Sequence, residues 1–146
     1  MKFRFIWVGK TRDKNWKALQ DEYLKRLSHF TACEIVEIKD SGVKIESNRI
    51  VELLNPKSFA VLLDVGGKDL SSQQLAQKLA KWQNGGLKEI CFVIGGADGV
   101  APAVAERVND RLSLSFLTFT HEMARVILLE QLYRAHAILK GFPYQR

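Results

Sequence analysis

A glycine-rich loop follows an apolar run in the last third of the chain. Phe92-Val93-Ile94 leads directly into Gly95-Gly96-Ala97-Asp98-Gly99. Glycines accept positive φ angles and let backbone amides approach a ligand closely, so this loop suits a nucleoside-like ligand. A tight turn between a strand and a helix would need the same glycines. The GGxxG spacing differs from the GxGxxG of dinucleotide folds, and no GxxxxGK[ST] occurs, so the loop does not indicate a phosphate cradle.

Aromatic and guanidinium side chains gather toward the C-terminus, as Tyr133, Arg134, Tyr144 and Arg146. Aromatic faces interleaved with arginines can stack an unpaired nucleic-acid base and hold its phosphates. A frayed basic tail is the alternative interpretation. Glu130 and Arg134 stand four residues apart on a predicted helix, where a simple ion pair is the default expectation.

The remaining polar residues do not form a hydrolytic or metal site. His121 is a candidate base, ligand or helix cap, and we assign it contact with a cofactor instead of catalysis. Asp64 and Asp98 are too far apart in sequence to be called a carboxylate pair, and no Ser/His/Asp set stands out. Cys33 and Cys91 lack ligand spacing and are predicted to be buried, reduced thiols. We therefore expect no metal and no protein nucleophile.

Length and composition predict one domain, residues 1–146. With 146 residues, 47% of them hydrophobic, the chain can bury a single core. No run reaches the roughly 18 uncharged apolar residues of a membrane span, and the first residues lack the apolar stretch of a signal peptide. A soluble, cytoplasmic protein that makes no membrane contact is the expectation.

The charge distribution favours a polyanionic partner. The formal net charge is +6, with residues 1–57 contributing +4, residues 58–110 −1 and residues 111–146 +3. Lys10, Arg12, Lys14 and Lys17 crowd a predicted loop and helix start, where they can track phosphates by counterion release. A solvated surface is the alternative for any one of these side chains.

Hydrophobic periodicity predicts alternating strands and helices. The expected strands are 2–8, 32–38, 59–63, 89–94 and 112–117, and the expected helices are 16–27, 44–54, 72–84, a short one at Pro102, and 122–139. Ser71 and Gln74 have the spacing of a capping box. This alternation indicates an α/β domain with a mainly parallel sheet and helices on both faces. Ligands bind such sheets at the strand carboxyl ends, so segments 64–68, 95–99 and 118–121 should form one pocket.

These motifs together resemble a known family. The resemblance rests on Phe92 to Gly96 with Gly99, Leu117 to Phe119 with His121, and further matches at Arg125, Glu130, Gln131, Tyr133, Arg134, Pro143 and Tyr144. The chain is similar over nearly its whole length to the SPOUT-class methyltransferases that modify N3 of a pseudouridine in 23S rRNA. The resemblance implies a C-terminal trefoil knot, which is a rare exception to the rule that chains do not thread their own loops. It also implies a homodimer.

The resemblance further implies that S-adenosylmethionine is the cofactor. Its expected contacts are in the three segments already grouped by their places after strands, and with the glycine loop they comprise Leu63, Gly95, Gly96, Gly99, Phe116, Leu117, Thr118, Phe119, Thr120 and His121. The sulfonium supplies the electrophile and the pseudouridine N3 attacks it, so no protein nucleophile is required.

By the same resemblance, Arg134, Tyr144 and Arg146 position the base and stabilise its developing negative charge. The tail of one subunit is expected to complete the cofactor pocket of the other, and the substrate is expected to be 23S rRNA in assembled ribosomes. Two residues depart from the family pattern, because Gln145 replaces a histidine and Thr120 a common proline. A non-catalytic module that binds RNA or ribosomes is the alternative function.

Overall fold

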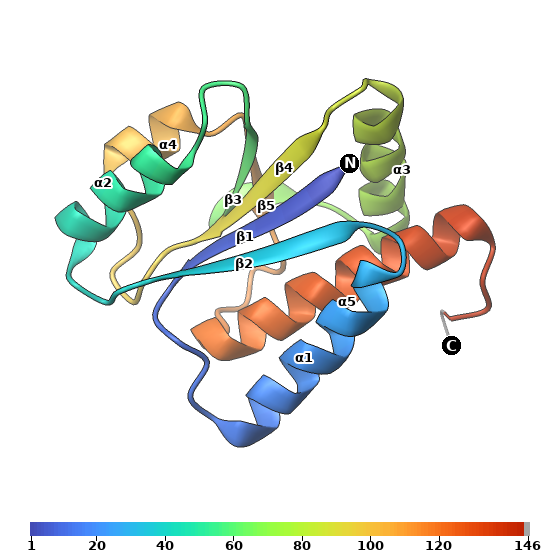
Figure 1. Cartoon of the computed structure of the whole chain (residues 1–146), viewed down its shortest axis with the longest axis horizontal. Coiled ribbons are helices and arrows are strands. Elements are labelled where there is room, and N and C mark those ends of the chain that lie inside the picture. The colour runs from blue at the N-terminus through green and yellow to red at the C-terminus, as the bar shows by residue number, and fades with distance from the viewer. Residues whose placement is uncertain (145–146) are drawn as a thin grey trace.

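The computed structural model describes residues 1–144 and shows a parallel α/β fold (Figure 1). In chain order the elements are β1 (Lys2–Val8), α1 (Lys14–Ser28), β2 (Ala32–Ile38), α2 (Val43–Leu53), β3 (Phe59–Asp69), α3 (Ser72–Asn84), β4 (Glu89–Ile94), α4 (Pro102–Arg107), β5 (Asp110–Ser113) and α5 (His121–Lys140). The sheet has the order β2-β1-β4-β3-β5, and every strand pair in it is parallel. The predicted fold class is confirmed in these respects.

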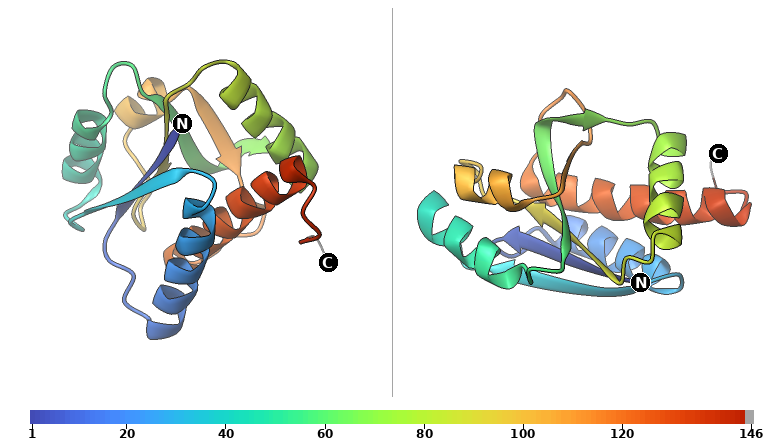
Figure 2. Two further views of the ribbon diagram at one scale, coloured as in Figure 1. Left: turned by 45° about the vertical axis from the view of Figure 1, so that its right-hand side comes forward. Right: turned by 90° about the horizontal axis from the view of Figure 1, so that it is seen from above.

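Helices cover both faces of the sheet, as predicted (Figures 1 and 2). Phe3, Phe5 and Trp7 of β1 are fully buried in the core beneath α1, α3 and α5. Ile6 and Val8, which alternate with them, belong to a separate core beneath α2 and α4. The period-two pattern of β1 therefore reports two buried faces, as in a central strand of a parallel sheet.

Local signals in the sequence set several helix ends. Ser71 and Gln74 form the predicted capping box at the start of α3. Pro102 begins α4. At the start of α5 the cap is Thr120, whose hydroxyl accepts from the Met123 N–H at 3.3 Å, and His121 is the first helical residue. The possibility that His121 caps this helix is thus excluded.

Two strand predictions are wrong at their ends. The strand beginning at Phe59 does not stop near Asp64 but continues to Asp69, with a register shift between Leu63 and Lys68. The last strand is Asp110–Ser113, and residues 114–117, predicted as strand, lie outside it.

The apolar residues after β5 account for the wrong end of the last predicted strand. Leu117 donates its N–H to the Ser115 hydroxyl, and the Ser113 hydroxyl donates to the Ser115 carbonyl, so side chains replace part of a strand ladder. Phe116 and Leu117 are 75% and 71% exposed, although their apolar side chains suggested a buried strand.

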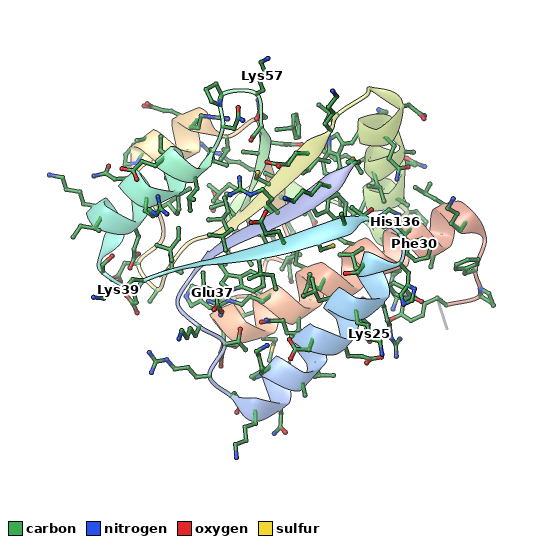
Figure 3. The ribbon with its side chains drawn as sticks, in the orientation of Figure 1. Lys25, Phe30, Glu37, Lys39, Lys57 and His136 are labelled. Atoms are coloured by element: carbon green, nitrogen blue, oxygen red, sulfur yellow. The ribbon has the colours of Figure 1, made fainter. Side chains whose placement is uncertain are left out.

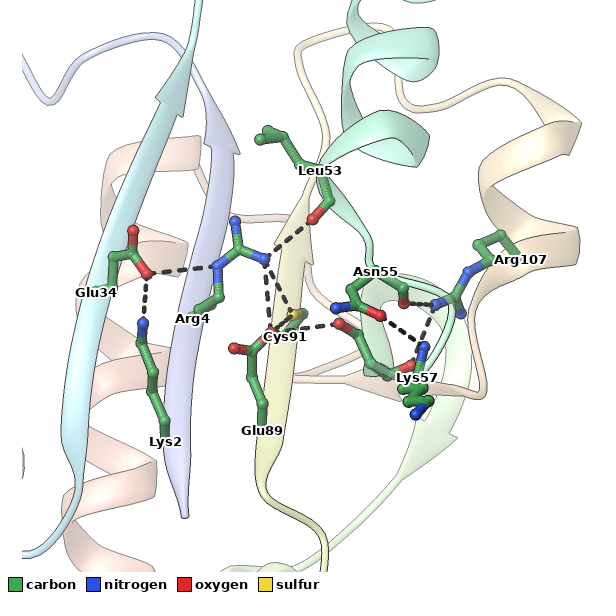
Figure 4. A network of polar contacts seen from close by, with 10 residues as sticks. Lys2, Arg4, Glu34, Leu53, Asn55, Lys57, Glu89, Cys91 and Arg107 are labelled. Carbon is green, nitrogen blue, oxygen red and sulfur yellow. Dashed lines mark hydrogen bonds and ion pairs between the residues drawn. The ribbon is translucent and has the colours of Figure 1, made fainter.

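The amino-terminal part of the sheet carries a polar network (Figure 4). Arg4 lies between Glu34 and Glu89, with N···O distances of 3.5 Å to each, and donates to the Leu53 carbonyl at 3.0 Å. Cys91 lies in the same network, and burial, with Glu89 beside it, raises the pKa of its thiol to about 11. Cys91 is a buried thiol as predicted, whereas Cys33 is half-buried. No helix among residues 1–144 is long and apolar enough to cross a membrane.

Candidate functional site

A cavity of about 510 Å³ opens at the carboxyl ends of β3 and β4. Its walls come from the end of β3, the loop after β4, and the segment between β5 and α5. The structure thus brings together the three segments that the sequence grouped. The predicted segment 64–68 is divided between two cavities. Asp64 and Val65 line this cavity, whereas Gly66, Gly67 and Lys68 line a smaller cavity beside Arg111.

Eight of the ten predicted cofactor residues line the larger cavity: Leu63, Gly95, Gly96, Gly99, Leu117, Thr118, Phe119 and His121. The other two do not. Phe116 points into solvent, and Thr120 serves as the cap of α5. Sequence reasoning missed Leu114 and Ser115 of the lining. Asp64 and Asp98, which also line the cavity, lie in the segments that the sequence grouped but were not among the ten assigned contacts.

The glycines of the loop are required by the protein's own packing. A Cβ atom at Gly95 would lie 2.7 Å from Cγ1 of Val100, and one at Gly96 would lie 2.9 Å from Oε1 of Glu46. Gly99 has a φ of 79°, in the left-handed region that favours glycine. The tight-turn interpretation therefore accounts for these residues without a ligand, and the cavity is the stronger evidence for a binding site.

Helix α2 holds the glycine loop from behind. Glu46 is 4% exposed, and its Oε2 accepts from the N–H groups of Ser41 and Gly42 at 2.8 and 2.9 Å. The buried hydroxyl of Ser47 accepts from the Ala101 N–H at 2.8 Å. Sequence reasoning missed both supports; their only signal was two polar residues on the buried side of a short helix.

The cavity suits a ligand that combines a heterocycle with a separate positively charged group. Leu62, Leu112 and Leu114 give it apolar walls, as is common for small-molecule sites of 300–1,000 Å³. Asp64 and Asp98 add carboxylates, and the Asp64 carboxylate is only weakly paired, at 3.8 Å from the Arg111 guanidinium. The residues present thus fit an adenosine-like ligand with a sulfonium or ammonium group.

A second polar cluster surrounds Tyr144. Its hydroxyl donates to Oε2 of Glu130 at 2.9 Å and lies 3.3 Å from the Tyr23 hydroxyl. Its ring packs edge-on against Tyr133 and beneath the Arg134 guanidinium, 4.8 Å away in each case. Burial and these hydrogen bonds raise the pKa of Tyr144, so the phenol stays protonated at neutral pH.

Glu130 also forms the predicted i,i+4 ion pair with Arg134. Nε and Nη2 of Arg134 lie 3.1 and 2.9 Å from Oε2 of Glu130. The hydrogen bond to Glu130 raises the pKa of Arg134, so this guanidinium remains charged. Two residues of the predicted tail site, Gln145 and Arg146, lie outside the described residues.

Within one chain, the tail cluster and the cavity are separate. His121 begins α5 and lines the cavity, whereas the tail follows the other end of this helix and folds back, so that Tyr144 contacts Glu130 (Figures 1 and 2). Glu130 lies nine residues after His121, which is about 13 Å along the helix axis, and Tyr144 does not line the cavity. The structure therefore does not bring Tyr144 to the cofactor cavity of its own chain.

A buried arginine joins the start of α5 to the end of β1. Arg125 is 2% exposed, and its Nη2 donates to the Val8 carbonyl at 2.6 Å. Its Nη1 donates to the Thr11 hydroxyl at 2.9 Å, and the guanidinium lies 4.9 Å from the centre of the Trp7 ring. Because Ala124 lines the cavity, this anchor sets one wall of the site from the side away from the ligand.

Comparison with known proteins agrees with this architecture. Residues 1–145 match a family model described as "Predicted SPOUT methyltransferase". The chain is 40% identical to "Ribosomal RNA large subunit methyltransferase H" of Desulfotalea psychrophila, with complete coverage of both chains. It is 44% identical to the protein of the same name from Geobacter metallireducens, over 99% of this chain and 98% of the relative.

A solved structure shares the fold without close sequence similarity. The probable methylase family protein from Haemophilus influenzae Rd KW20 superimposes with a TM-score of 0.60 at 9% identity, covering 99% of this chain and 70% of the other. With the full-length family match and the 40% and 44% identities, these findings settle the classification. The chain belongs to the SPOUT methyltransferase family.

Proposed function

We propose that this protein transfers a methyl group from S-adenosylmethionine to N3 of a pseudouridine in 23S rRNA, on assembled ribosomes in the cytoplasm. The observation that carries the proposal is the cavity between the glycine loop and the start of α5, in a chain that matches the family over residues 1–145. Relatives named as ribosomal RNA large subunit methyltransferases cover the chain from end to end, which supports an rRNA substrate.

The residues of the cavity would hold the cofactor, which when bound supplies an electrophilic methyl group on a sulfonium. The leucines would enclose the adenosine, and Asp64 and Asp98 would attract the positive charges. Thr118, Phe119 and His121 would close the side nearest α5 and exclude water from the reacting atoms. His121 is exposed and is one of several lining residues, in keeping with a contact role.

The tail would position the target base. Arg134 keeps N–H donors that Glu130 does not occupy, and the Tyr144 hydroxyl becomes a donor to the base when it exchanges Glu130 for the substrate, so the two can hold the carbonyl oxygens on either side of N3. Arg146, in the part of the tail outside the described residues, is the third proposed participant. None of the three acts as a nucleophile.

Because Tyr144 contacts the middle of α5 and does not line the cavity of its own chain, we infer that the protein acts as a homodimer whose tails complete the cavities in trans. The exposed Phe116 and Leu117 near the cavity are apolar side chains that a partner could cover. We also infer one domain and the family's C-terminal knot. The match to the family over residues 1–145 supports the knot.

Mixing two defective chains tests the dimer. A Thr118→Trp chain has a bulky side chain in the cavity wall and an intact tail, and a chain ending at Pro143 has the reverse. If tails act in trans, random re-association of the mixture restores one intact site in each heterodimer, about a quarter of all sites. If each tail serves its own cavity, the mixture stays inactive, and the trans arrangement is refuted.

The decisive test of function is to incubate radiolabelled S-adenosylmethionine with ribosomes and with free rRNA, and then to map the labelled nucleotide. We expect label on a pseudouridine of 23S rRNA, with ribosomes the better substrate. A non-catalytic RNA-binding module, the alternative, would bind ribosomes without methylating them. Calorimetry measures whether the purified protein binds S-adenosylmethionine. No binding of S-adenosylmethionine would refute the methyltransferase proposal.

A further inference from the structure

The loop between β1 and α1 is held rigidly against the start of α5 (Figure 1). Glu122 accepts hydrogen bonds from the backbone N–H groups of Arg12 and Asp13, the latter at 3.1 Å. Arg125 holds Thr11 from below, and the Thr11 hydroxyl donates to Gln20 at 2.5 Å. The loop thus lacks the freedom of an ordinary surface connection.

Three basic side chains, on this loop and at the first residue of α1, lie in water. Lys10, Arg12 and Lys14 are exposed, and in residues 1–144 none of them forms an ion pair. Lys17, by contrast, pairs with Asp21 at 2.6 Å and is therefore less available. The nearest acidic residue in the sequence is Asp13, whose carboxylate is engaged in capping α1.

The sheet places this loop beside the cofactor cavity. All strand pairs are parallel, so their carboxyl ends lie at one edge, and β1 lies next to β4 in the sheet. The ends of β3 and β4 form the cavity, and the end of β1 leads into the basic loop. Glu122 and Arg125, which fix the loop, directly follow His121 and Ala124 of the cavity wall.

We propose that Lys10, Arg12 and Lys14 form an anchor for the phosphate backbone of the RNA substrate, which Glu122 and Arg125 hold in register with the cofactor cavity. The proposal rests on the proposed function, because it takes the substrate to be rRNA. Three unpaired cations, two on the fixed loop and one at the first residue of α1, suit a polyanion whose phosphates are spaced along a chain. Glu122 is a positioning residue, since it touches only the loop.

A charge-matched pair of triple variants tests the anchor. K10Q/R12Q/K14Q removes the loop cations, and K57Q/K81Q/K88Q removes three exposed lysines near the opposite edge of the sheet; Figure 3 shows Lys57 there. Both variants lower the formal net charge from +6 to +3. All six side chains are exposed, so neither variant should disturb folding, which circular dichroism checks.

Binding to ribosomes is measured by filter retention over a range of salt concentrations. The loop variant should bind about tenfold more weakly than the wild type. The negative slope of log K against log salt should become shallower by about 2. The control variant should stay within about threefold of the wild type. Equal losses in the two variants, or no loss in the loop variant, would overturn the anchor.

Glu122 is tested by comparing Glu122→Gln with Glu122→Ala, which remove the same charge. Only glutamine keeps an oxygen that can accept from the loop N–H groups. The KM for ribosomes should be about fivefold higher for Glu122→Ala than for Glu122→Gln. The affinity for S-adenosylmethionine, measured by calorimetry, should be equal in the two variants. Equal KM values would refute the positioning role.

The wild type is assayed in parallel to separate two kinds of failure. A wild-type protein that methylates rRNA while the loop variant does so equally well overturns only the anchor. A wild-type protein that does not methylate rRNA overturns the proposed function and the anchor with it.

Discussion

Replacing Arg125 by methionine should destabilise the protein by about 2–4 kcal/mol. The substitution removes two hydrogen bonds from a charged donor, to the Val8 carbonyl and the Thr11 hydroxyl, each typically worth ~1.5–3 kcal/mol. It also removes the contact with Trp7, worth ~1–2 kcal/mol when desolvated. The gross loss is therefore about 4–8 kcal/mol.

Relief of an unfavourable burial offsets part of this loss. Burial lowers the pKa of Arg125, the carboxylates of Glu37 and Glu122 oppose that effect, and the Nε donor has no partner among the described residues. Replacing such a buried charge by an apolar side chain recovers about 1–4 kcal/mol in known cases, and subtracting the middle of this range from the middle of the gross loss leaves about 3.5 kcal/mol. The hydrogen bonds should prevail because both are short and both acceptors are partly or fully enclosed.

Urea denaturation followed by tryptophan fluorescence measures the effect, with wild type and variant at one protein concentration, since dimerisation would otherwise contribute. In a thermal scan of the same samples, at about 3 °C per kcal/mol, the melting temperature should fall by about 6–12 °C. Arg125→Lys keeps the charge but cannot reach both the Val8 carbonyl and the Thr11 hydroxyl. Its free energy of unfolding should therefore be no higher than that of Arg125→Met. A methionine variant as stable as the wild type would show that the burial cost dominates.

Three further predictions concern the tail and the core. Tyr144→Phe removes the donor to Glu130 and should lower the kcat of methyl transfer about 10- to 100-fold, whereas unchanged kcat would refute a role for the hydroxyl. Burial lowers the pKa of His136 to about 4, and its ring stacks on Phe30 at 5.0 Å (Figure 3). Because the unfolded chain then binds the extra proton, the free energy of unfolding should drop by up to about 3 kcal/mol as the pH falls from 6.5 to 4. His136→Phe should lack this component of the pH dependence; an identical pH profile would contradict the assignment. Gln145→His should leave the methylation rate within about tenfold of the wild type, and a rise of several orders of magnitude would show that the family histidine is an obligatory proton acceptor.

The sequence correctly predicted strands whose two ends are marked by neighbouring residues in the chain. β2 and β4 have the predicted ends, because apolar and β-branched residues bounded by polar or glycine residues define each of them. The extension of β3 could not be predicted in this way. Its residues 64–69 read as a polar turn, and they become strand because they continue alongside β5 after a register shift.

The supports of the site were unpredictable for a related reason. Arg125 contacts Val8 across 117 positions in sequence, and Ser47 contacts Ala101 across 54. Periodicity reports which face of an element is apolar but not which distant backbone group needs a donor or acceptor. The strand-end rule succeeded for the cavity because it depends only on parallel topology, which the alternation of elements already indicated.

The tail geometry also refines the chemistry proposed for Arg134. Two of its donors are bound to Glu130, so the pair presents hydrogen bonds to a substrate with little net charge. That is sufficient, because a methyl transfer from a sulfonium to an imide anion neutralises both charges, and a cavity that excludes water favours their loss. A strong cation beside N3 would stabilise the anion but also make it a poorer nucleophile. We therefore expect Glu130 to moderate Arg134, and the cluster around Tyr144 to serve chiefly in holding the base in line with the cavity of the partner subunit.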